Sequence, residues 1–279
     1  MLHMTNMTIL ERPKSKFNED LITTVRFQVD GKYTEERSKK QKSIVYMKIE
    51  KVKPDNDPFA ALIGGGSGAG KSTIIKTFFA PELEELSDAT QFVYIDSDNI
   101  KETIDEYREY CRDEETVFYA AFYVHGESTD IADMLIEECI ERNLSFIYDG
   151  TMSWKPQYDE LIPKLKENGY EVSGVYVDVD VEKAVDRVET RGKENKRFVP
   201  EEIVRKANCN SAITFSKLEK CFDGVMMFNN TADRDSMDTS PIEPFYNRDS
   251  PADMPFQGEI LNNEFFDLFI EKSKLEYIE

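Results

Sequence analysis

The residues best suited to chemistry stand near position 65, where five glycines lie within residues 64–70 and a Lys-Ser pair follows. The spacing Gly65-x-x-x-x-Gly70-Lys71-Ser72 matches the phosphate-loop pattern G-x-x-x-x-G-K-[ST] without a mismatch. Glycines let successive backbone N–H groups turn toward phosphate oxygens, the lysine reaches the β- and γ-phosphates, and the serine hydroxyl can bind Mg²⁺. A chance glycine-rich turn is the alternative. We expect a nucleoside triphosphate to be bound by Gly65, Gly66, Ser67, Gly68, Ala69, Gly70, Lys71, Ser72 and Thr73.

Two carboxylates follow the next apolar run. In "FVYIDSDNIK" Asp96 and Asp98 are two residues apart, so their side chains leave the same face if the strand extends through both. One could contact the metal shell while the other orients an acceptor hydroxyl, as small-molecule kinases require. A solvated strand-to-loop turn is the alternative, since aspartate is common there.

A cluster of cations lies further along, in "DRVETRGKENKR" at 186–197. We expect this glycine-containing segment to form a lid loop between a strand and a helix that starts near Pro200. Arginine there would stabilise the transferring phosphoryl group, whereas ordinary solvated loop charge is the alternative. The cations are Arg187, Arg191, Lys193, Lys196 and Arg197.

Other nucleotide-binding classes fit less well. A GTPase should show N-K-x-D after a late strand, and "NTAD" at 230–233 lacks the lysine. The net charge of −20 opposes binding to nucleic acid or anionic membranes. Four cysteines without a C-x-x-C pair and two histidines disfavour a zinc site or a disulfide framework. No run approaches 18 apolar residues, so we expect a cytoplasmic protein without a membrane segment.

Short apolar runs alternate with helical patterns from residue 59 onward. Strands are expected near 58–64, 91–96, 143–150, 170–179 and 224–230, with helices from 72, 128 and 158. This alternation predicts an α/β, three-layer P-loop NTPase kinase-like fold, with a central, mostly parallel sheet flanked by helices. We expect three parts: a helical N-terminal extension at 1–57, a kinase domain at 58–230, and an irregular segment with a closing helix at 231–279.

Five stretches in this order resemble the zeta-toxin family of phosphate-loop kinases. They are "GGGSGAGKST", "YIDSDNIK", "HGESTDIA", "YDGTMSW" and "DRVETRGKENKRFVP", and they span residues from about 60 to 230. Two of them look closest to the branch that includes plant calmodulin-dependent NAD kinases. The resemblance implies ATP and Mg²⁺ as cofactors and transfer of phosphate to a small-molecule hydroxyl. In the bacterial toxins that acceptor is UDP-N-acetylglucosamine.

Site roles follow from the resemblance position by position. Asp98 matches the family's general base, Lys71 and Ser72 match its phosphate-loop pair, and Arg187 and Arg197 match the arginines on the ATP phosphates. Lys71 and these two arginines would bear the charge of the transition state, and Arg191 is expected to help bind the nucleotide. Ser153 stands where the toxins keep an arginine that grips the nucleotide sugar, which weakens the case for a UDP-sugar. The residues expected to bind the acceptor are Asp96, Lys101, His125, Asp133, Asp149, Thr151 and Trp154. The alternatives are a solvated helix face for Asp133, a hydrogen-bonded turn for His125 and structural packing for Trp154.

Two rival functions stay open. One is a nucleotide-binding regulator that phosphorylates no acceptor. The other, which the family resemblance suggests, is a toxin held inactive by an antitoxin-like protein partner. The basic stretch 36–53 is the candidate for a calmodulin target, but a packing helix is the favoured interpretation.

Overall fold

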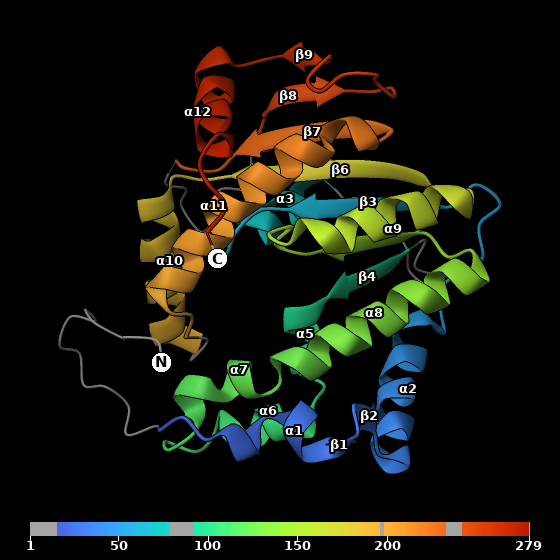
Figure 1. Ribbon diagram of the computed structural model, residues 1–279, viewed down its shortest axis with the longest axis vertical. Coiled ribbons are helices and arrows are strands. Elements are labelled where there is room, and N and C mark those ends of the chain that lie inside the picture. The colour runs from blue at the N-terminus through green and yellow to red at the C-terminus, as the bar shows by residue number, and fades with distance from the viewer. Residues whose placement is uncertain (1–15, 79–91, 196–197, 233–241, 279) are drawn as a thin grey trace.

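The computed structural model describes residues 16–78, 92–195, 198–232 and 242–278. A seven-stranded sheet forms its centre, parallel in its first five strands and antiparallel in its last two (Figure 1). The predicted fold class is confirmed. In spatial order the strands are β4 (Val93–Asp96), β5 (Phe146–Asp149), β3 (Phe59–Gly64), β6 (Glu171–Asp178), β7 (Gly224–Asn229), β8 (Pro244–Arg248) and β9 (Glu259–Ile260).

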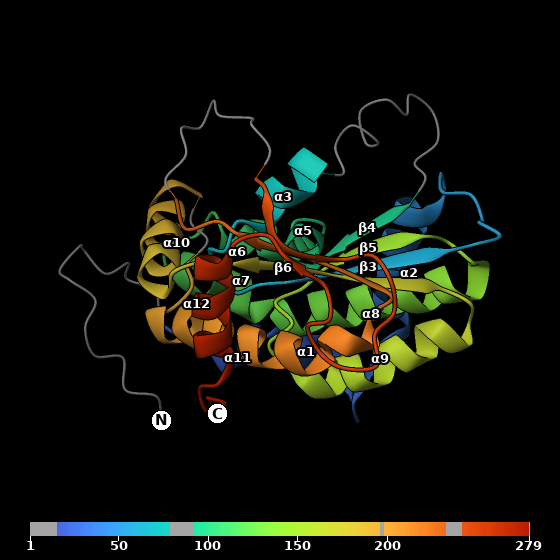
Figure 2. The ribbon, with the colours of Figure 1, turned by 90° about the horizontal axis from the view of Figure 1, so that it is seen from above.

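Helices cover both faces of the sheet, which explains why its strands are apolar throughout. Successive side chains of β3 enter different cores: Ala61 and Ile63 face one, while Ala60 and Leu62 face the other. The first core is closed by α3 (Lys71–Phe78) and α10 (Val181–Asn195). On the opposite face lie α8 (His125–Arg142), α9 (Lys155–Glu167) and α11 (Glu201–Leu218), as Figure 2 shows from above.

Short elements connect β4 to α8 and α11 to β7. They are α5 (Ser97–Lys101), α6 (Asp105–Tyr110), the 3-10 turn η2 (Val117–Tyr119), α7 (Ala120–Tyr123) and the 3-10 turn η3 (Glu219–Cys221). Among the described residues, no helix combines the length and apolarity that a membrane span requires.

The N-terminal segment packs against α8. Its elements are η1 (Glu19–Leu21), α1 (Thr23–Phe27), the hairpin strands β1 (Gln28–Val29) and β2 (Lys32–Tyr33), and α2 (Glu35–Ile49). The Thr34 hydroxyl accepts a hydrogen bond from the Arg37 backbone N–H and so caps α2. Val45 and Ile49 of α2 belong to the same core as the sheet.

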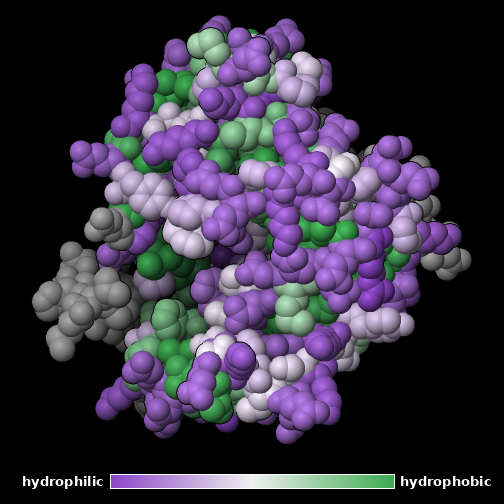
Figure 3. All heavy atoms as spheres, turned by 45° about the vertical axis from the view of Figure 1, so that its right-hand side comes forward, coloured by the Kyte–Doolittle hydropathy of each residue, from purple (hydrophilic) through white to green (hydrophobic). Residues whose placement is uncertain are grey.

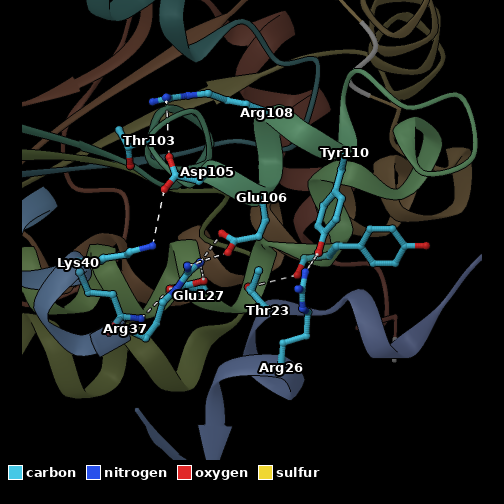
Figure 4. A network of polar contacts seen from close by, with 12 residues as sticks. Thr23, Arg26, Arg37, Lys40, Thr103, Asp105, Glu106, Arg108, Tyr110 and Glu127 are labelled. Atoms are coloured by element: carbon cyan, nitrogen blue, oxygen red, sulfur yellow. Dashed lines mark hydrogen bonds and ion pairs between the residues drawn. The ribbon is translucent and has the colours of Figure 1, made fainter. Parts of the chain in front are cut away.

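A buried ion network fixes α2 against two later helices (Figure 4). The Arg37 guanidinium donates to Glu106 of α6 at 2.7 and 2.9 Å, and to Glu127 of α8 at 2.6 and 2.7 Å. Gln41 adds a bond of 2.9 Å to Glu127, and the Arg37 guanidinium lies 4.1 Å from the centre of the Phe27 ring. Two carboxylates and one arginine are therefore enclosed together, and each depends on the others for its charge balance.

Our expectation of an irregular segment after residue 230 is wrong for Pro244–Arg248, because β8 extends the sheet there, while residues 249–258 are irregular as expected. Phe245 and Tyr246 are buried, and Arg248 forms a buried ion pair of 2.9 Å with Glu219. These long-range contacts outweigh the local abundance of proline and aspartate. The predicted closing helix is α12 (Asn263–Ser273), with Phe269 buried.

Candidate active site

The register of the sheet brings the phosphate loop and two carboxylates to one edge. Asp149, the last residue of β5, pairs with Asp96 on one side and with Ile63 of β3 on the other. The loop begins two residues after Ile63. In open parallel sheets ligands bind at the carboxyl ends of the strands, so this edge is the candidate active site.

The phosphate loop lies between β3 and α3, as the motif requires. Gly65 has φ of 139° and Gly70 has φ of 84°, backbone conformations that residues with a side chain rarely adopt. The Lys71 ammonium donates to the Gly65 carbonyl at 2.9 Å and so folds back over the loop. Ser72, in the first turn of α3, is exposed.

Two asparagine side chains hold the loop from outside. Asn230 donates to the Ala69 carbonyl at 2.9 Å, and Asn208 donates to the Ser67 carbonyl at 3.0 Å. A Cβ placed on Gly70 would lie 2.0 Å from the Asn230 amide nitrogen. The loop is therefore pre-shaped by neutral amides in close contact with glycine.

Asp149 and Lys71 form the centre of the site. Lys71 Nζ lies 3.7 Å from Asp149 Oδ1, and the Tyr94 hydroxyl donates to Asp149 Oδ2 at 2.9 Å. Burial raises the pKa of Asp149, although the Lys71 ammonium and the Tyr94 bond act against it. Burial, followed by the nearby charges of Asp149 and Asp98, raises the pKa of Asp96 to about 6.

Asp98 does not continue the strand with Asp96, contrary to the expectation of one shared strand face. The strand ends at Asp96, whose carboxylate accepts a hydrogen bond of 2.8 Å from the Asp98 N–H and caps α5. Aspartate at that position starts a helix readily, which explains the early end of the strand. Lys101, buried on the last turn of α5, donates to the Asp98 carboxylate at 2.7 Å.

His125 and Asp133 both lie on α8, which packs against α5. Desolvation of the imidazole, followed by the Lys101 ammonium, lowers the pKa of His125, while the Asp98 carboxylate opposes this shift. Asp133 is about two turns further along the helix. Desolvation and the neighbouring Asp130 and Glu137 carboxylates raise its pKa to about 6.

The cationic segment forms part of a helix, so the predicted lid loop is wrong for residues 186–195. Arg187 and Arg191 lie four residues apart on α10, and Gly192 is buried within that helix. Strong helix formers around a single glycine explain this outcome. Arg187 donates to the carbonyls of Asn230 at 2.6 Å and Ala232 at 3.0 Å, whereas Arg191 Nε is buried without a hydrogen bond among the described residues. Lys196 and Arg197 lie outside the described residues.

The turn after β5 contacts the phosphate loop through its main chain. The Thr151 carbonyl accepts a hydrogen bond of 3.2 Å from the Gly65 N–H and one of 2.6 Å from the Ser211 hydroxyl. The Thr151 and Ser153 hydroxyls lie 2.8 Å apart. Trp154, at the start of α9, is 62% exposed.

Sequence reasoning missed three supports of the site: Asn208, Asn230 and Tyr94. An asparagine on the buried side of a helix was a usable signal for Asn208, because a buried amide needs partners. Asn230 was considered only as part of a failed guanine motif. Nothing local to Tyr94 indicated its bond to Asp149, because that bond depends on strand order.

The zeta toxin family model matches residues 44–239, well over half of the chain. A calmodulin calcium-dependent NAD kinase from Arabidopsis thaliana is 37% identical over 109 residues. That match covers 38% of this chain and 20% of the plant protein, so the chain spans only a fifth of this relative.

Solved structures agree on the fold. A chain from the PezAT chromosomal toxin-antitoxin system of Streptococcus pneumoniae has a TM-score of 0.59 at 18% identity, covering 86% of this chain and 96% of that one. The AvrRxo1-ORF1:-ORF2 complex with ATP has a TM-score of 0.61 at 16% identity, with coverages of 89% and 76%. By its family match and its fold, the chain belongs to the zeta-toxin family of P-loop kinases.

Proposed function

We propose that this protein transfers the γ-phosphoryl group of ATP to a hydroxyl of a nucleotide-like small molecule. The observation that carries the proposal is the strand register, which sets Asp149 beside both the phosphate loop and Asp96, with Asp98 in the next turn. Such an edge supplies the two things phosphoryl transfer needs: cations for the phosphates and a carboxylate for the acceptor. The structure of AvrRxo1-ORF1:-ORF2 with ATP supports the choice of nucleotide.

On the nucleotide side, the loop N–H groups and Lys71 would hold the β- and γ-phosphates. Arg191 Nε is buried without a hydrogen bond among the described residues, so this guanidinium fits a role in binding the transferring phosphoryl group. From the family resemblance we assign the same role to Arg187 and Arg197. Both guanidiniums of α10 would bear part of the charge that develops on the equatorial oxygens.

Mg²⁺ fits the oxygen donors at this edge. The Ser72 hydroxyl and a carboxylate such as Asp96 are donors of the type that Mg²⁺ takes together with phosphates and water. Within the described residues, no group of three or more His, Cys, Asp or Glu side chains is placed to hold a metal ion. When bound, it would neutralise charge on the phosphates.

On the acceptor side, Asp98 would orient the hydroxyl and take its proton. Its carboxylate is 46% exposed and paired with Lys101, which keeps it reachable and holds it in position. His125, Asp133, Thr151 and Trp154 would surround the rest of the acceptor. Since the relative from Arabidopsis is an NAD kinase, and since the family resemblance implies UDP-N-acetylglucosamine, these two are the acceptors to try.

The test is a kinase assay with γ-labelled ATP and Mg²⁺, offering UDP-N-acetylglucosamine and NAD separately beside a no-acceptor control. We expect label on one of the two, and its loss by a factor on the order of 10² or more in Asp98→Asn, since a positioned base contributes that much. ATP affinity should stay unchanged. Asp105→Asn, an exposed aspartate on α6, serves as the matched control. Normal turnover in Asp98→Asn would remove this residue from the role.

An antitoxin-like partner is the second candidate feature, because one structural relative comes from a toxin-antitoxin system. Purification of the chain from its own cells at low salt would test it. A stoichiometric companion protein whose removal raises turnover supports inhibition by a partner. Full activity from protein purified alone, with no companion, argues against it.

In the kinase assay, release of free phosphate alone, with neither acceptor labelled, would favour a regulatory ATPase.

A further inference from the structure

The residues that follow α12 run along α11 toward the candidate active site (Figure 1). We call residues 274–278 the C-terminal strap. The Ile278 N–H donates to Asn210 Oδ1 at 2.9 Å, and Asn210 Nδ2 donates to the Ile278 carbonyl at 2.7 Å. Asn210 is only 1% exposed. One buried amide thus satisfies both main-chain groups of a single residue, as a neighbouring strand would.

Hydrogen bonds rather than apolar burial hold the strap. Leu275, Tyr277 and Ile278 are 53%, 41% and 41% exposed, so their side chains bury little surface. The Tyr277 hydroxyl donates to the Ser153 carbonyl. Just before the strap, Lys272 of α12 donates to Asp178 and to the Val179 carbonyl, both at 2.6 Å, at the carboxyl end of β6. The strap is therefore tied to α11 through Ile278 and to the turn after β5 through Tyr277, and the end of α12 before it is tied to the carboxyl end of β6.

The turn that the strap touches is the one that leads away from Asp149. Its Thr151 carbonyl is already held by the Gly65 N–H and by Ser211 of α11. Ser153, two residues further on, receives its main-chain bond from Tyr277 instead. The first half of the turn is thus fixed by the phosphate loop, and the second half by the strap.

A hollow opens between the C-terminal elements and the α7–α8 side of the molecule, with apolar side chains at its edge (Figure 3). The exposed ring of Trp154 directly follows Ser153. An exposed indole ring offers a flat apolar surface to a planar group such as a nucleobase. Any shift of the Ser153 main chain would move that ring.

We propose that the C-terminal strap sets the position of Ser153 and Trp154 for acceptor binding, with Tyr277 as a positioning residue. Its effect on the acceptor rests on the proposed function, while its effect on the turn does not. The nucleotide side is held separately, through Asn208 and Asn230. Loss of the strap should therefore weaken binding of the acceptor and leave ATP affinity unchanged.

Trp154 is the chain's single tryptophan, so its emission reports on this turn alone. Tyr277→Phe removes the donor but keeps the ring. Leu275→Ala, at an exposed strap residue, is the matched control. In Tyr277→Phe we expect a larger acrylamide quenching constant and a lower anisotropy for Trp154, with an unchanged melting temperature. Leu275→Ala should behave as the wild type. A chain ending at Ser273 should show the full effect.

The same emission then measures binding of UDP-N-acetylglucosamine and of NAD, with ATP binding followed by calorimetry. We expect an apparent Kd for the acceptor about fivefold higher in Tyr277→Phe, the factor that one ordinary hydrogen bond represents. Unchanged Trp154 quenching in both Tyr277→Phe and the shortened chain overturns the proposal. An equal loss of ATP affinity also overturns it, because the strap would then support the whole protein. If neither probe binds the wild type, the proposed acceptor class fails, and the quenching result still decides about the strap.

Discussion

The phosphate loop and the α5–α8 side of the site are held by different kinds of contact. Neutral amides of Asn208 and Asn230 hold the loop through its carbonyl groups. On the other side the supports are charged: Lys101 pairs with Asp98, and Arg37 holds α6 and α8 together through Glu106 and Glu127. The difference follows from the ligand proposed for each side: the triphosphate at the loop and the acceptor at the α5–α8 side.

A triphosphate brings several negative charges to the loop, so carboxylate supports there would repel it. Amides fix the loop without adding charge to it. The acceptor side needs ionised carboxylates, and carboxylates close together raise one another's pKa. Cations between them reduce that repulsion. Three substitutions test whether the two sides differ in this way.

The largest effect is expected on the charged side. Arg37→Met would leave Glu106 and Glu127 buried without their cation and lower the free energy of unfolding by about 3–5 kcal/mol. Arg108→Met is the matched control, because Arg108 is 56% exposed and lies 3.9 Å from Asp105 (Figure 4). Its cost should stay below ~1 kcal/mol. Urea unfolding of both variants measures the difference, with Arg37→Lys expected to fall between them.

Equal midpoints for Arg37→Met and Arg108→Met would show that the network is energetically neutral. The contrast between charged and neutral supports would then fail.

Gly70→Ala addresses the neutral side. The added Cβ would meet the Asn230 amide and also require a strained backbone at φ of 84°. We expect ATP affinity to fall roughly fivefold to 160-fold, the range that 1–3 kcal/mol of strain represents. Gly169→Ala has nearly the same φ, 82°, with nothing within 4 Å of the added Cβ. Calorimetric titration with ATP should find this control at wild-type affinity. A similar loss of ATP affinity in both variants would show that contact between the added Cβ and Asn230 is not the cause.

The smallest effect is a gain in stability at Asp96. Its raised pKa, about 6 against an ordinary 3.8, means that the ionised carboxylate destabilises the folded protein above pH 6. Asp96→Asn keeps the helix cap and should add ~1–2 kcal/mol at pH 7, less than the ~2.7 kcal/mol that two pKa units represent, since water screens part of the charge. Because the penalty disappears as the pH falls toward 3.8, the gain should shrink toward zero near pH 4.

Thermal unfolding of Asp96→Asn between pH 4 and 7 measures this trend. Asp113→Asn is the matched control, because Asp113 also accepts a bond from the N–H two residues on but is exposed. A gain that is the same at pH 4 and pH 7 would contradict an electrostatic origin. Turnover should fall in Asp96→Asn, since the same charge is needed in the proposed reaction.

The sequence predicted those parts of the protein whose signal is local. Gly65 to Ser72 follow a fixed spacing, and alternating apolar runs were enough to predict the parallel sheet that places Asp96 and Asp149 together. The supporting contacts of Asn208, Asn230 and Tyr94 were not predictable in this way, because each of these side chains binds a residue that is distant in the chain. Asn230 and Ala69, for example, are 161 residues apart.

Two errors have the same origin. The glycine at 192 suggested a loop, yet packing keeps it inside α10. Prolines and aspartates after residue 230 suggested irregular chain, yet the buried pair of Arg248 and Glu219 holds β8 on the sheet. In both places tertiary contacts outweigh local propensity.

The Arg37 network also constrains the order in which the chain assembles during synthesis. Glu106 and Glu127 lie 69 and 90 residues after Arg37, so α2 leaves the ribosome long before its partners exist. An unpaired guanidinium is not buried, because enclosing a lone charge costs several kcal/mol. We therefore expect α2 to stay exposed to solvent until α8 has formed. Although α2 is synthesised early, it can pack in its final position only after α6 and α8 have been synthesised.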